Sequence, residues 1–119
     1  MKILHIEDNK MVIDVVKEML KGNEFKSCES LDDVKVKDLK WADLIFLDLI
    51  LDASSVELKG LKVLDLMKKN GMKKKVVILS ALPEEAKKAK FKYNDLVIGI
   101  IGKPFLKNDL DKYVKKAKK

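Results

Sequence analysis

The chain has 119 residues, 47% of them hydrophobic, which fits one domain with a buried core. No apolar run approaches the ~20 residues of a membrane span, and the acidic pair after residue 6 leaves no signal-peptide hydrophobic region. The formal net charge is +7, but the basic residues are all lysines, spread over most of the predicted helices. Without arginine, and without interleaved aromatic residues, this charge argues against nucleic-acid binding and fits a solvated surface. The single cysteine, Cys28, excludes an internal disulfide and fits a cytoplasmic protein, where we expect it to be buried.

Apolar runs alternate with amphipathic segments along the whole chain. Runs of about four to six apolar residues bounded by polar ones are typical of buried strands. Such runs cover residues 2–6, 44–47, 75–79 and 97–101, and a weaker strand is expected near residues 25–29. The segments that follow them have apolar residues at helical spacing and predict helices. They cover residues 10–21, 31–40 and 58–70, a segment that begins at Pro83, and residues 107–118.

The predicted helices differ in how many apolar residues anchor them. The stripe of the first helix consists of Val12, Val15, Val16, Met19 and Leu20. The last helix is expected to bury Leu110, Tyr113, Val114 and Ala117. The fourth offers a core only Ala86, Ala89 and Phe91, so we expect it to be weakly anchored. Residues 49–57 have mixed polarity and no period, which predicts a loop.

This alternation predicts right-handed crossovers and a parallel sheet with helices on both faces. Five strand–helix units in 119 residues predict one doubly wound α/β domain, residues 1–119, with five helices. The flavodoxin-like strand order for such a domain is 2-1-3-4-5, which we adopt from the general rule.

Polar residues stand where four of the five predicted strands end. Glu7 and Asp8 follow the first strand, Asp48 the third, Ser80 the fourth and Lys103 the fifth. The carboxyl ends of parallel strands share one edge, so we expect these side chains to converge in one crevice.

The carboxylates of this crevice predict a magnesium site. Close like charges cost stability unless a cation relieves them, and oxygen ligands without nearby His or Cys suit Mg²⁺. The only histidine, His5, lies inside the first predicted strand and reads as a packed core residue, so a zinc site is excluded. Taken singly, Asp8 or Asn9 could instead be a helix N-cap and Lys103-Pro104 a simple turn. Together, the strand-end residues predict an aspartate that accepts a phosphoryl group, with a metal and a lysine neutralising its charge.

The motifs ILHIED, DLIFLDL, VVILSAL and GKPF, at the ends of these strands, resemble the receiver domains of two-component response regulators. The resemblance covers essentially the full chain and is closest to stand-alone, chemotaxis-regulator-like receivers. It implies that Asp48 is the phosphoacceptor, and that Asp8, Asp48 and the backbone carbonyl of Ile50 bind Mg²⁺ directly. Glu7 would act mainly through metal-bound water. Ser80 would be the switch hydroxyl and Lys103 would contact a phosphoryl oxygen, aimed by a peptide bond to Pro104 that is often cis in this family.

The chain departs from the family pattern in three places. Ile100 stands where the family has a switch aromatic, three residues before the lysine. The segment from Asp48 to Gly60 is longer than usual and has Asp52 where proline is common. Ile50 and Leu82 are large aliphatic residues at positions that are usually polar. They would shield an acyl phosphate from water, so we expect slow autodephosphorylation.

These features predict a phosphoryl-operated switch rather than an enzyme acting on a separate substrate. A histidine kinase or phosphotransfer protein would phosphorylate Asp48, and output would follow from binding another protein. The lysine-rich face of the last two helices would suit an acidic partner, although we favour a solvated surface as the explanation of these lysines. The alternative is a receiver-like scaffold that works without phosphorylation, which Ile100 favours. Ile50 argues against an aspartyl phosphatase, which carries a second acid there, and the lack of a phosphate-binding loop after the first strand argues against a flavin protein.

Overall fold

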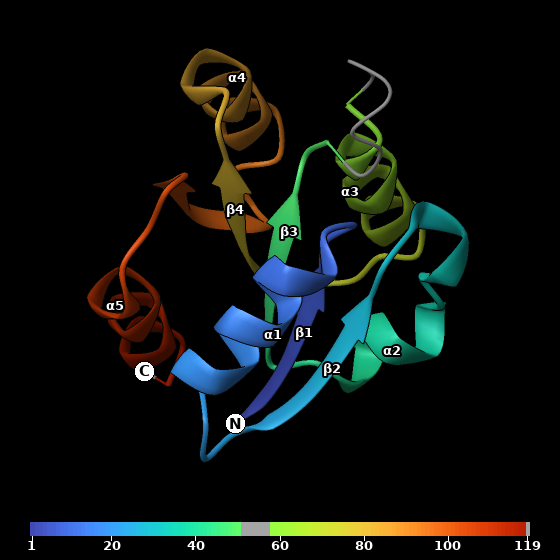
Figure 1. Ribbon diagram of the computed structural model, residues 1–119. Coiled ribbons are helices and arrows are strands. Elements are labelled where there is room, and N and C mark those ends of the chain that lie inside the picture. Colours follow the sequence, from blue (N-terminus) through green and yellow to red (C-terminus); the bar gives the residue numbers. More distant parts are fainter. Residues whose placement is uncertain (51–57, 119) are drawn as a thin grey trace.

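The computed structural model describes residues 1–50 and 58–118, which form a five-stranded parallel sheet between two layers of helices (Figure 1). The strands are β1 (Lys2–Ile6), β2 (Glu24–Cys28), β3 (Leu44–Asp48), β4 (Lys75–Ser80) and β5 (Val97–Gly102). Their order is β2-β1-β3-β4-β5, and every neighbouring pair is parallel. The predicted flavodoxin-like order is confirmed. The α-helices are α1 (Lys10–Met19), α2 (Val36–Trp41), α3 (Gly60–Lys69), α4 (Pro83–Lys92) and α5 (Lys107–Ala117).

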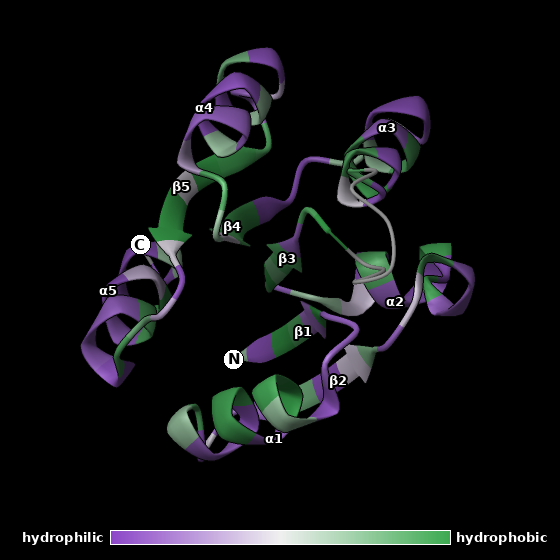
Figure 2. Cartoon of the chain, turned by 45° about the horizontal axis from the view of Figure 1, so that its top comes forward, coloured by the Kyte–Doolittle hydropathy of each residue, from purple (hydrophilic) through white to green (hydrophobic). Residues whose placement is uncertain are grey.

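Helices cover both faces of the sheet, with α1 and α5 on one face and α2, α3 and α4 on the other (Figure 2). Successive strand residues point to opposite faces, so β1 sends Ile3 to the α1–α5 core and Leu4 to the other core. All five residues of β3 are buried, as expected for a central parallel strand. Among the described residues, no helix is both long and apolar enough to cross a membrane.

Residues 31–40 do not form the single helix that their apolar spacing predicts. The chain instead makes a short 3-10 helix, η1 (Leu31–Asp33), then an extended Val34 and Lys35, and only then α2. Val34 is 9% exposed and Leu39 fully buried in the same core. The break reorients the chain so that both side chains reach this core, and burial there outweighs local helix propensity.

Two burial predictions for the helices are also wrong. Phe91 is 85% exposed, because α4 turns Ala86 and Ala89 inward and position 91 lies about 200° round the helix from Ala89. Val15 of the α1 stripe is likewise 48% exposed, whereas Val16 is buried. Cys28 and His5 are buried as predicted. The predicted loop lies mostly in residues 51–57, outside the described residues, as does Asp52.

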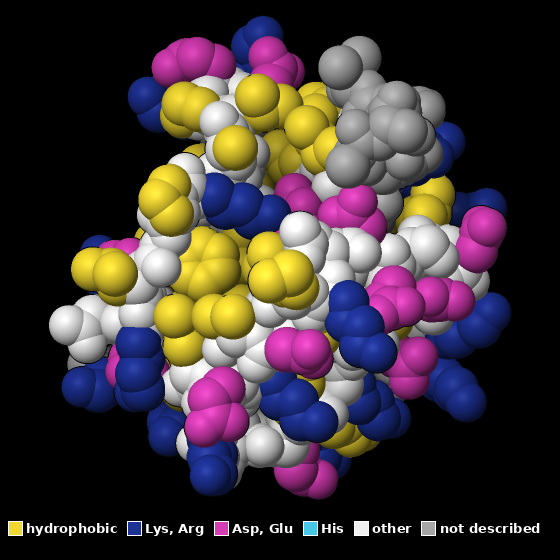
Figure 3. Space-filling model, in the orientation of Figure 1, with side chains coloured by type: hydrophobic (Ala, Val, Ile, Leu, Met, Phe, Trp, Pro, Cys, Tyr) yellow, Lys and Arg dark blue, Asp and Glu magenta, His cyan; other side chains and the backbone are white. Residues whose placement is uncertain are grey.

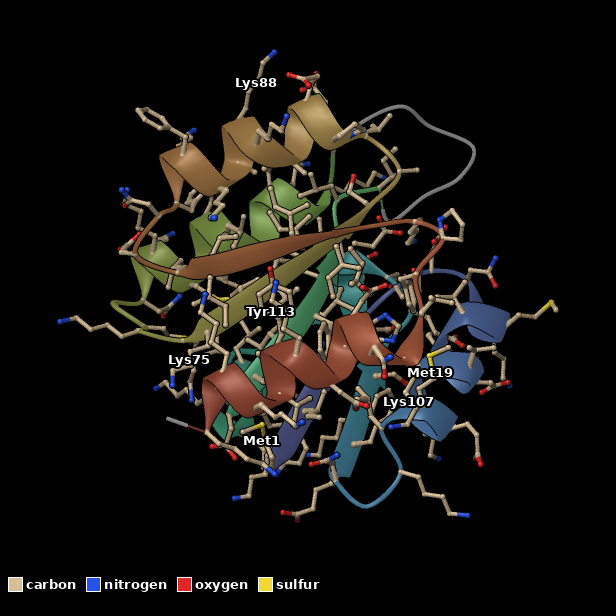
Figure 4. All side chains as sticks on the ribbon, turned by 90° about the vertical axis from the view of Figure 1, so that its left-hand side faces the viewer. Met1, Met19, Lys75, Lys88, Lys107 and Tyr113 are labelled. Atoms are coloured by element: carbon tan, nitrogen blue, oxygen red, sulfur yellow. The ribbon has the colours of Figure 1, made fainter. Side chains whose placement is uncertain are left out.

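Tyr113 of α5 packs against the backbone of β5 at Gly99. A Cβ atom built on Gly99 would lie 2.2 Å from the Tyr113 ring, so the ring occupies the space of a side chain at that position. Figure 4 shows Tyr113 reaching from α5 toward the sheet. Tyr113 is only partly buried, packed against the α1–α5 core, although it was expected to be buried.

Candidate functional site

The carboxyl ends of the strands bring the predicted site residues into one pocket of about 300 Å³. Its lining includes all of the strand-end residues singled out from the sequence, namely Glu7, Asp8, Asp48, Ser80 and Lys103. Acidic and basic side chains meet there in a hollow above the sheet, flanked by apolar surface (Figure 3). Ile50 lines the same pocket, and its backbone N–H donates to Asp48 Oδ1 at 3.1 Å.

Lys103 binds two carboxylates from two different strands. Its Nζ donates to Glu7 Oε1 at 2.7 Å and to Asp48 Oδ2 at 3.0 Å. Glu7 is 1% exposed and Asp48 7% exposed, so both charges are held largely out of water. The Lys103 backbone N–H donates to Ser80 O at 2.9 Å, and the Lys103–Pro104 peptide is cis, as the resemblance implies.

Burial and charge shift the pKa values of this ion pair. Burial raises the pKa of Glu7, and the hydrogen bond from Lys103 only partly opposes that rise. Burial alone would lower the pKa of Lys103, but its hydrogen bond to Glu7 and the charge on Asp48 raise it above its usual value. Glu7, Asp8 and Asp48 bring three carboxylates together in the pocket, and a divalent cation would offset their mutual repulsion.

The acidic residues fit a magnesium ion. Glu7, Asp8 and Asp48 each offer a carboxylate oxygen, and these oxygens lie within 4.8 Å of one another. Adjacent ligands of octahedral Mg²⁺ are about 3 Å apart and opposite ones about 4.2 Å, so the carboxylates would have to move closer together to bind the ion directly. Oxygen ligands alone, with room left for water, are the set that this ion prefers.

Asn9 and Gly60 fix the positions of the acids. The Asn9 side chain caps α1 by accepting from Met11 N and Val12 N, and the Asn9 backbone N–H donates to Glu7 Oε2 at 3.3 Å. Gly60 starts α3 so close to β3 that an added Cβ would lie 2.4 Å from the Asp48 carbonyl oxygen. Sequence reasoning considered Asn9 only as a cap and missed Gly60. The sequence signal that could have indicated a role for Gly60 was its position as a glycine between a polar segment and an apolar helix.

Ser80 faces the pocket, but its hydrogen bonds go to the turn that precedes α4. Its Oγ accepts from Leu82 N at 2.9 Å and donates to Leu82 O at 3.3 Å. Ile100, where an aromatic residue was expected, packs partly buried against the core under α4. The site therefore unites the acids and the lysine, while the serine is engaged elsewhere.

A second hollow adjoins this pocket and is almost wholly apolar. It has a volume of about 480 Å³ and lies between α1 and the segment after β5. Met11 is 77% exposed on its rim, and Lys103 and Val12 line both this groove and the acidic pocket.

The family model of the response regulator receiver domain matches residues 3–115. The chain belongs to this family. No curated protein sequence matches it at a significant level. Among solved structures, the receiver domain of NtrX from Brucella abortus is 27% identical, with a TM-score of 0.78 over 97% of this chain and 96% of that one.

Another similar structure is the signal receiver domain of a putative Luxo repressor protein from Vibrio parahaemolyticus. It is 22% identical with a TM-score of 0.79, and the match covers 98% of this chain and 92% of that one. A longer NtrX chain from Brucella abortus, in complex with ADP, is 27% identical with a TM-score of 0.78 over 98% of this chain. The present chain spans only 25% of that longer chain. The flavodoxin-like receiver fold is thus shared by isolated receiver domains and by longer proteins that contain one.

Proposed function

We propose that this receiver domain accepts a phosphoryl group on Asp48 from a histidine kinase or a phosphotransfer protein, and signals by binding another protein. The observation that carries the proposal is the contact of Lys103 Nζ with Asp48 Oδ2 at 3.0 Å inside a pocket that also contains Glu7 and Asp8. A buried nucleophilic carboxylate, an adjacent cation and a metal-binding acid pair are the parts that phosphoryl transfer to an aspartate needs.

In the proposed reaction, a carboxylate oxygen of Asp48 attacks the phosphorus of a phosphohistidine. A P–O bond forms, the P–N bond breaks, and the imidazole leaves with its electron pair and takes up a proton. A magnesium ion bound by Asp8, Asp48 and the Ile50 carbonyl, with Glu7 acting mainly through metal-bound water, would neutralise charge on the transferred oxygens. Lys103 already lies against Asp48, so it is placed to bind an oxygen of the arriving group.

The donor would approach beside the apolar groove between α1 and the segment after β5. Because Lys103 lines both the groove and the acidic pocket, a protein that delivers a phosphoryl group to Asp48 covers exposed Met11 as well. A small donor such as acetyl phosphate needs no such contact. Met11→Glu should therefore slow transfer from a phosphorylated donor protein and leave labelling by acetyl phosphate unchanged.

The same proposal includes a cytoplasmic location and no reaction other than the chain's own phosphorylation and dephosphorylation. The lysine-rich face of α4 and α5 would suit an acidic output partner. A scaffold that works without phosphorylation is the second candidate, and Ile100 in the core under α4 favours it because no aromatic ring is available there to report the phosphoryl group.

Labelling with acetyl phosphate separates the two candidates. The protein is incubated with acetyl phosphate and Mg²⁺, and intact mass is measured. One added phosphoryl group is expected for the wild type and for Asp14→Asn, which removes an exposed acid on α1. Asp48→Asn should remain unlabelled. A wild type that does not label, or an Asp48→Asn variant that labels equally, would reject phosphorylation of Asp48 and support the scaffold function.

A further inference from the structure

The apolar groove beside the acidic pocket contains two of the five methionines of the chain. Met11, Val15 and Met19 are spaced four residues apart, so they follow one another along the same face of α1 and line one side of the groove. Pro104 and Phe105 line the other side. Figure 4 shows Met19 on the side of α1 that faces α5. Because thioethers are apolar but readily oxidised, the polarity of this groove depends on the state of two sulfur atoms.

The five methionines differ in how far solvent reaches them. Met11 is 77% exposed, whereas Met67 is fully buried and Met72 is 9% exposed. Met1 and Met19 are partly buried. A peroxide must reach the sulfur atom in order to oxidise it, so exposure sets the order in which the methionines react. We therefore expect Met11 to be oxidised first.

The backbone of Met11 is well fixed although its side chain is exposed. Its N–H donates to Asn9 Oδ1 at 2.9 Å in the capped first turn of α1. The next residue, Val12, lines both the groove and the acidic pocket, as Lys103 does. The sulfur atom is thus held on the rim of the groove, close to the phosphoacceptor pocket. An oxygen atom added there changes the surface of the groove without disturbing the buried core.

Oxidation by a hydroperoxide would make this part of the rim polar. The sulfur lone pair of Met11 attacks the terminal oxygen of the peroxide, so that an S–O bond forms and the O–O bond breaks. The proton on the transferred oxygen passes to the leaving oxygen, which departs as an alcohol or as water. Sulfur loses two electrons and the peroxide gains them. The sulfoxide oxygen is a strong hydrogen-bond acceptor, and covering it with an apolar surface that has no donor is unfavourable.

We propose that Met11 is a reversible oxidation site, and that its sulfoxide prevents a phosphodonor protein from docking in the groove. The blocking effect rests on the proposed function, whereas the oxidation itself does not. A methionine sulfoxide reductase with a dithiol would restore the thioether, releasing the oxygen as water and oxidising the dithiol to a disulfide. Protein donors would then phosphorylate Asp48 only while Met11 is reduced, and small donors would be unaffected.

The order of oxidation tests the site without any phosphoryl group. The whole chain is treated with hydrogen peroxide, and sulfoxides are located by digestion and mass spectrometry. In the folded protein Met11 should react roughly 10-fold or more faster than buried Met67. In urea all five methionines should react at similar rates, because the fold no longer protects them. Equal rates for Met11 and Met67 in the folded protein, or faster oxidation of Met19 than of Met11, would overturn the proposal.

Phosphotransfer to singly oxidised protein tests the blocking effect. The protein donor is a histidine phosphotransfer domain phosphorylated with phosphoramidate, chosen from a panel as the one that labels the untreated chain fastest. Oxidation should slow transfer from this domain by about 10-fold and leave labelling by acetyl phosphate unchanged. Reductases for both sulfoxide epimers, with dithiothreitol, should restore the untreated rate. Undiminished transfer to the oxidised protein would overturn the proposal.

Two leucine variants assign the effect to one sulfur atom. Met11→Leu keeps an apolar side chain of similar size but has no sulfur, so its treated and untreated rates of transfer should be equal. Met19→Leu, in the same groove, is the matched control and should slow on oxidation as the wild type does. If oxidation slows Met11→Leu as much as the wild type, Met11 is not the site of the effect.

Failure of the proposed function would give a different result. If no phosphotransfer domain labels the untreated chain, delivery by a protein is contradicted and the blocking effect falls with it, while the order of oxidation still decides whether Met11 is the oxidation site. If oxidation lowers labelling by acetyl phosphate as much as transfer from the domain, it acts on the acidic pocket, which would contradict the role of the groove.

Discussion

The acid-bearing side of the pocket and the α4 side are built differently. Glu7 and Asp48 extend from strands buried on both faces, and Lys103 bonds the two carboxylates to each other. On the other side, α4 rests on two alanines and is fastened at its start by the bonds between Ser80 and Leu82. The residues that would carry out phosphoryl transfer are therefore held by the buried core, whereas α4, which could respond to changes in the pocket, is lightly packed. A substitution on the acid side should therefore cost more stability than a matched one elsewhere.

Removal of the Lys103 ammonium should have the largest effect. Lys103→Met leaves Glu7 and Asp48 buried without their cation, which typically costs about 3 kcal/mol of unfolding free energy. Lys107→Met is the matched control, because Lys107 forms an exposed i,i+4 pair with Asp111 worth about 0.5 kcal/mol or less. Urea unfolding without Mg²⁺ measures both. Equal losses of unfolding free energy in the two variants would show that the buried ion pair contributes no more to stability than the surface pair.

Gly60→Ala should cause the second largest loss of unfolding free energy. The added methyl group would meet the backbone of Asp48 and Leu49, at 2.4 and 2.7 Å, and main-chain atoms cannot rotate away. We expect a loss of about 2 kcal/mol in unfolding free energy, and slower labelling of the displaced Asp48. Gly102→Ala is the control, since nothing lies within 4 Å of a Cβ built there. A Gly60→Ala protein as stable as Gly102→Ala would show that α3 does not position Asp48.

His5 should give the acid side a pH dependence. Among the described residues neither imidazole nitrogen has a hydrogen-bond partner, and burial, aided by the Lys103 charge, lowers the His5 pKa to about 3. The unfolded chain takes up this proton near pH 6.5 and the folded one does not, so stability is full above pH 6.5 and falls as pH drops toward 3.

Between pH 7 and pH 5 the His5 effect should lower the unfolding free energy by about 2 kcal/mol. His5→Leu should remove that part of the pH dependence while keeping stability at pH 7 within about 1 kcal/mol of wild type or above it. Unfolding of both proteins at the two pH values checks the difference. Equal pH dependence in the two proteins would mean that His5 has a partner or is protonated in the fold.

The smallest expected effect concerns the lifetime of the phosphoryl group. Ile50 lines the pocket and Leu82 borders it through Ser80, and neither side chain can orient a water molecule. Ile50→Asn with Leu82→Glu should speed phosphate loss about 10-fold, or about 1.4 kcal/mol in the barrier, followed by the decay of labelled intact mass. Rapid loss from the wild type, within seconds, with no acceleration in the double variant, would refute the shielding role.

The sequence predicted the strands because apolar runs and their polar ends are local signals, whereas the strand order was adopted from the general rule for such domains. The same signals predicted that Glu7, Asp8, Asp48, Ser80 and Lys103 would share one pocket. It did not predict the break at Val34, where tertiary burial decides, nor the exposure of Phe91, since a helix this short of apolar residues has no strong pattern. The Lys103–Glu7 pair, the Gly60 contact and the Tyr93–Asp65 bond join residues far apart in the chain, which periodicity cannot reveal.

The central claim is that Asp48 receives the phosphoryl group, and chemical trapping at that residue tests it most directly. Protein treated with acetyl phosphate and Mg²⁺ is reduced with borohydride, which converts an aspartyl phosphate into homoserine, and is then digested and sequenced by mass spectrometry. We predict homoserine at position 48 and at no other acid. Homoserine at Asp8, hydroxynorvaline at Glu7, or no reduced residue in a protein whose labelling has been verified by intact mass would contradict the account.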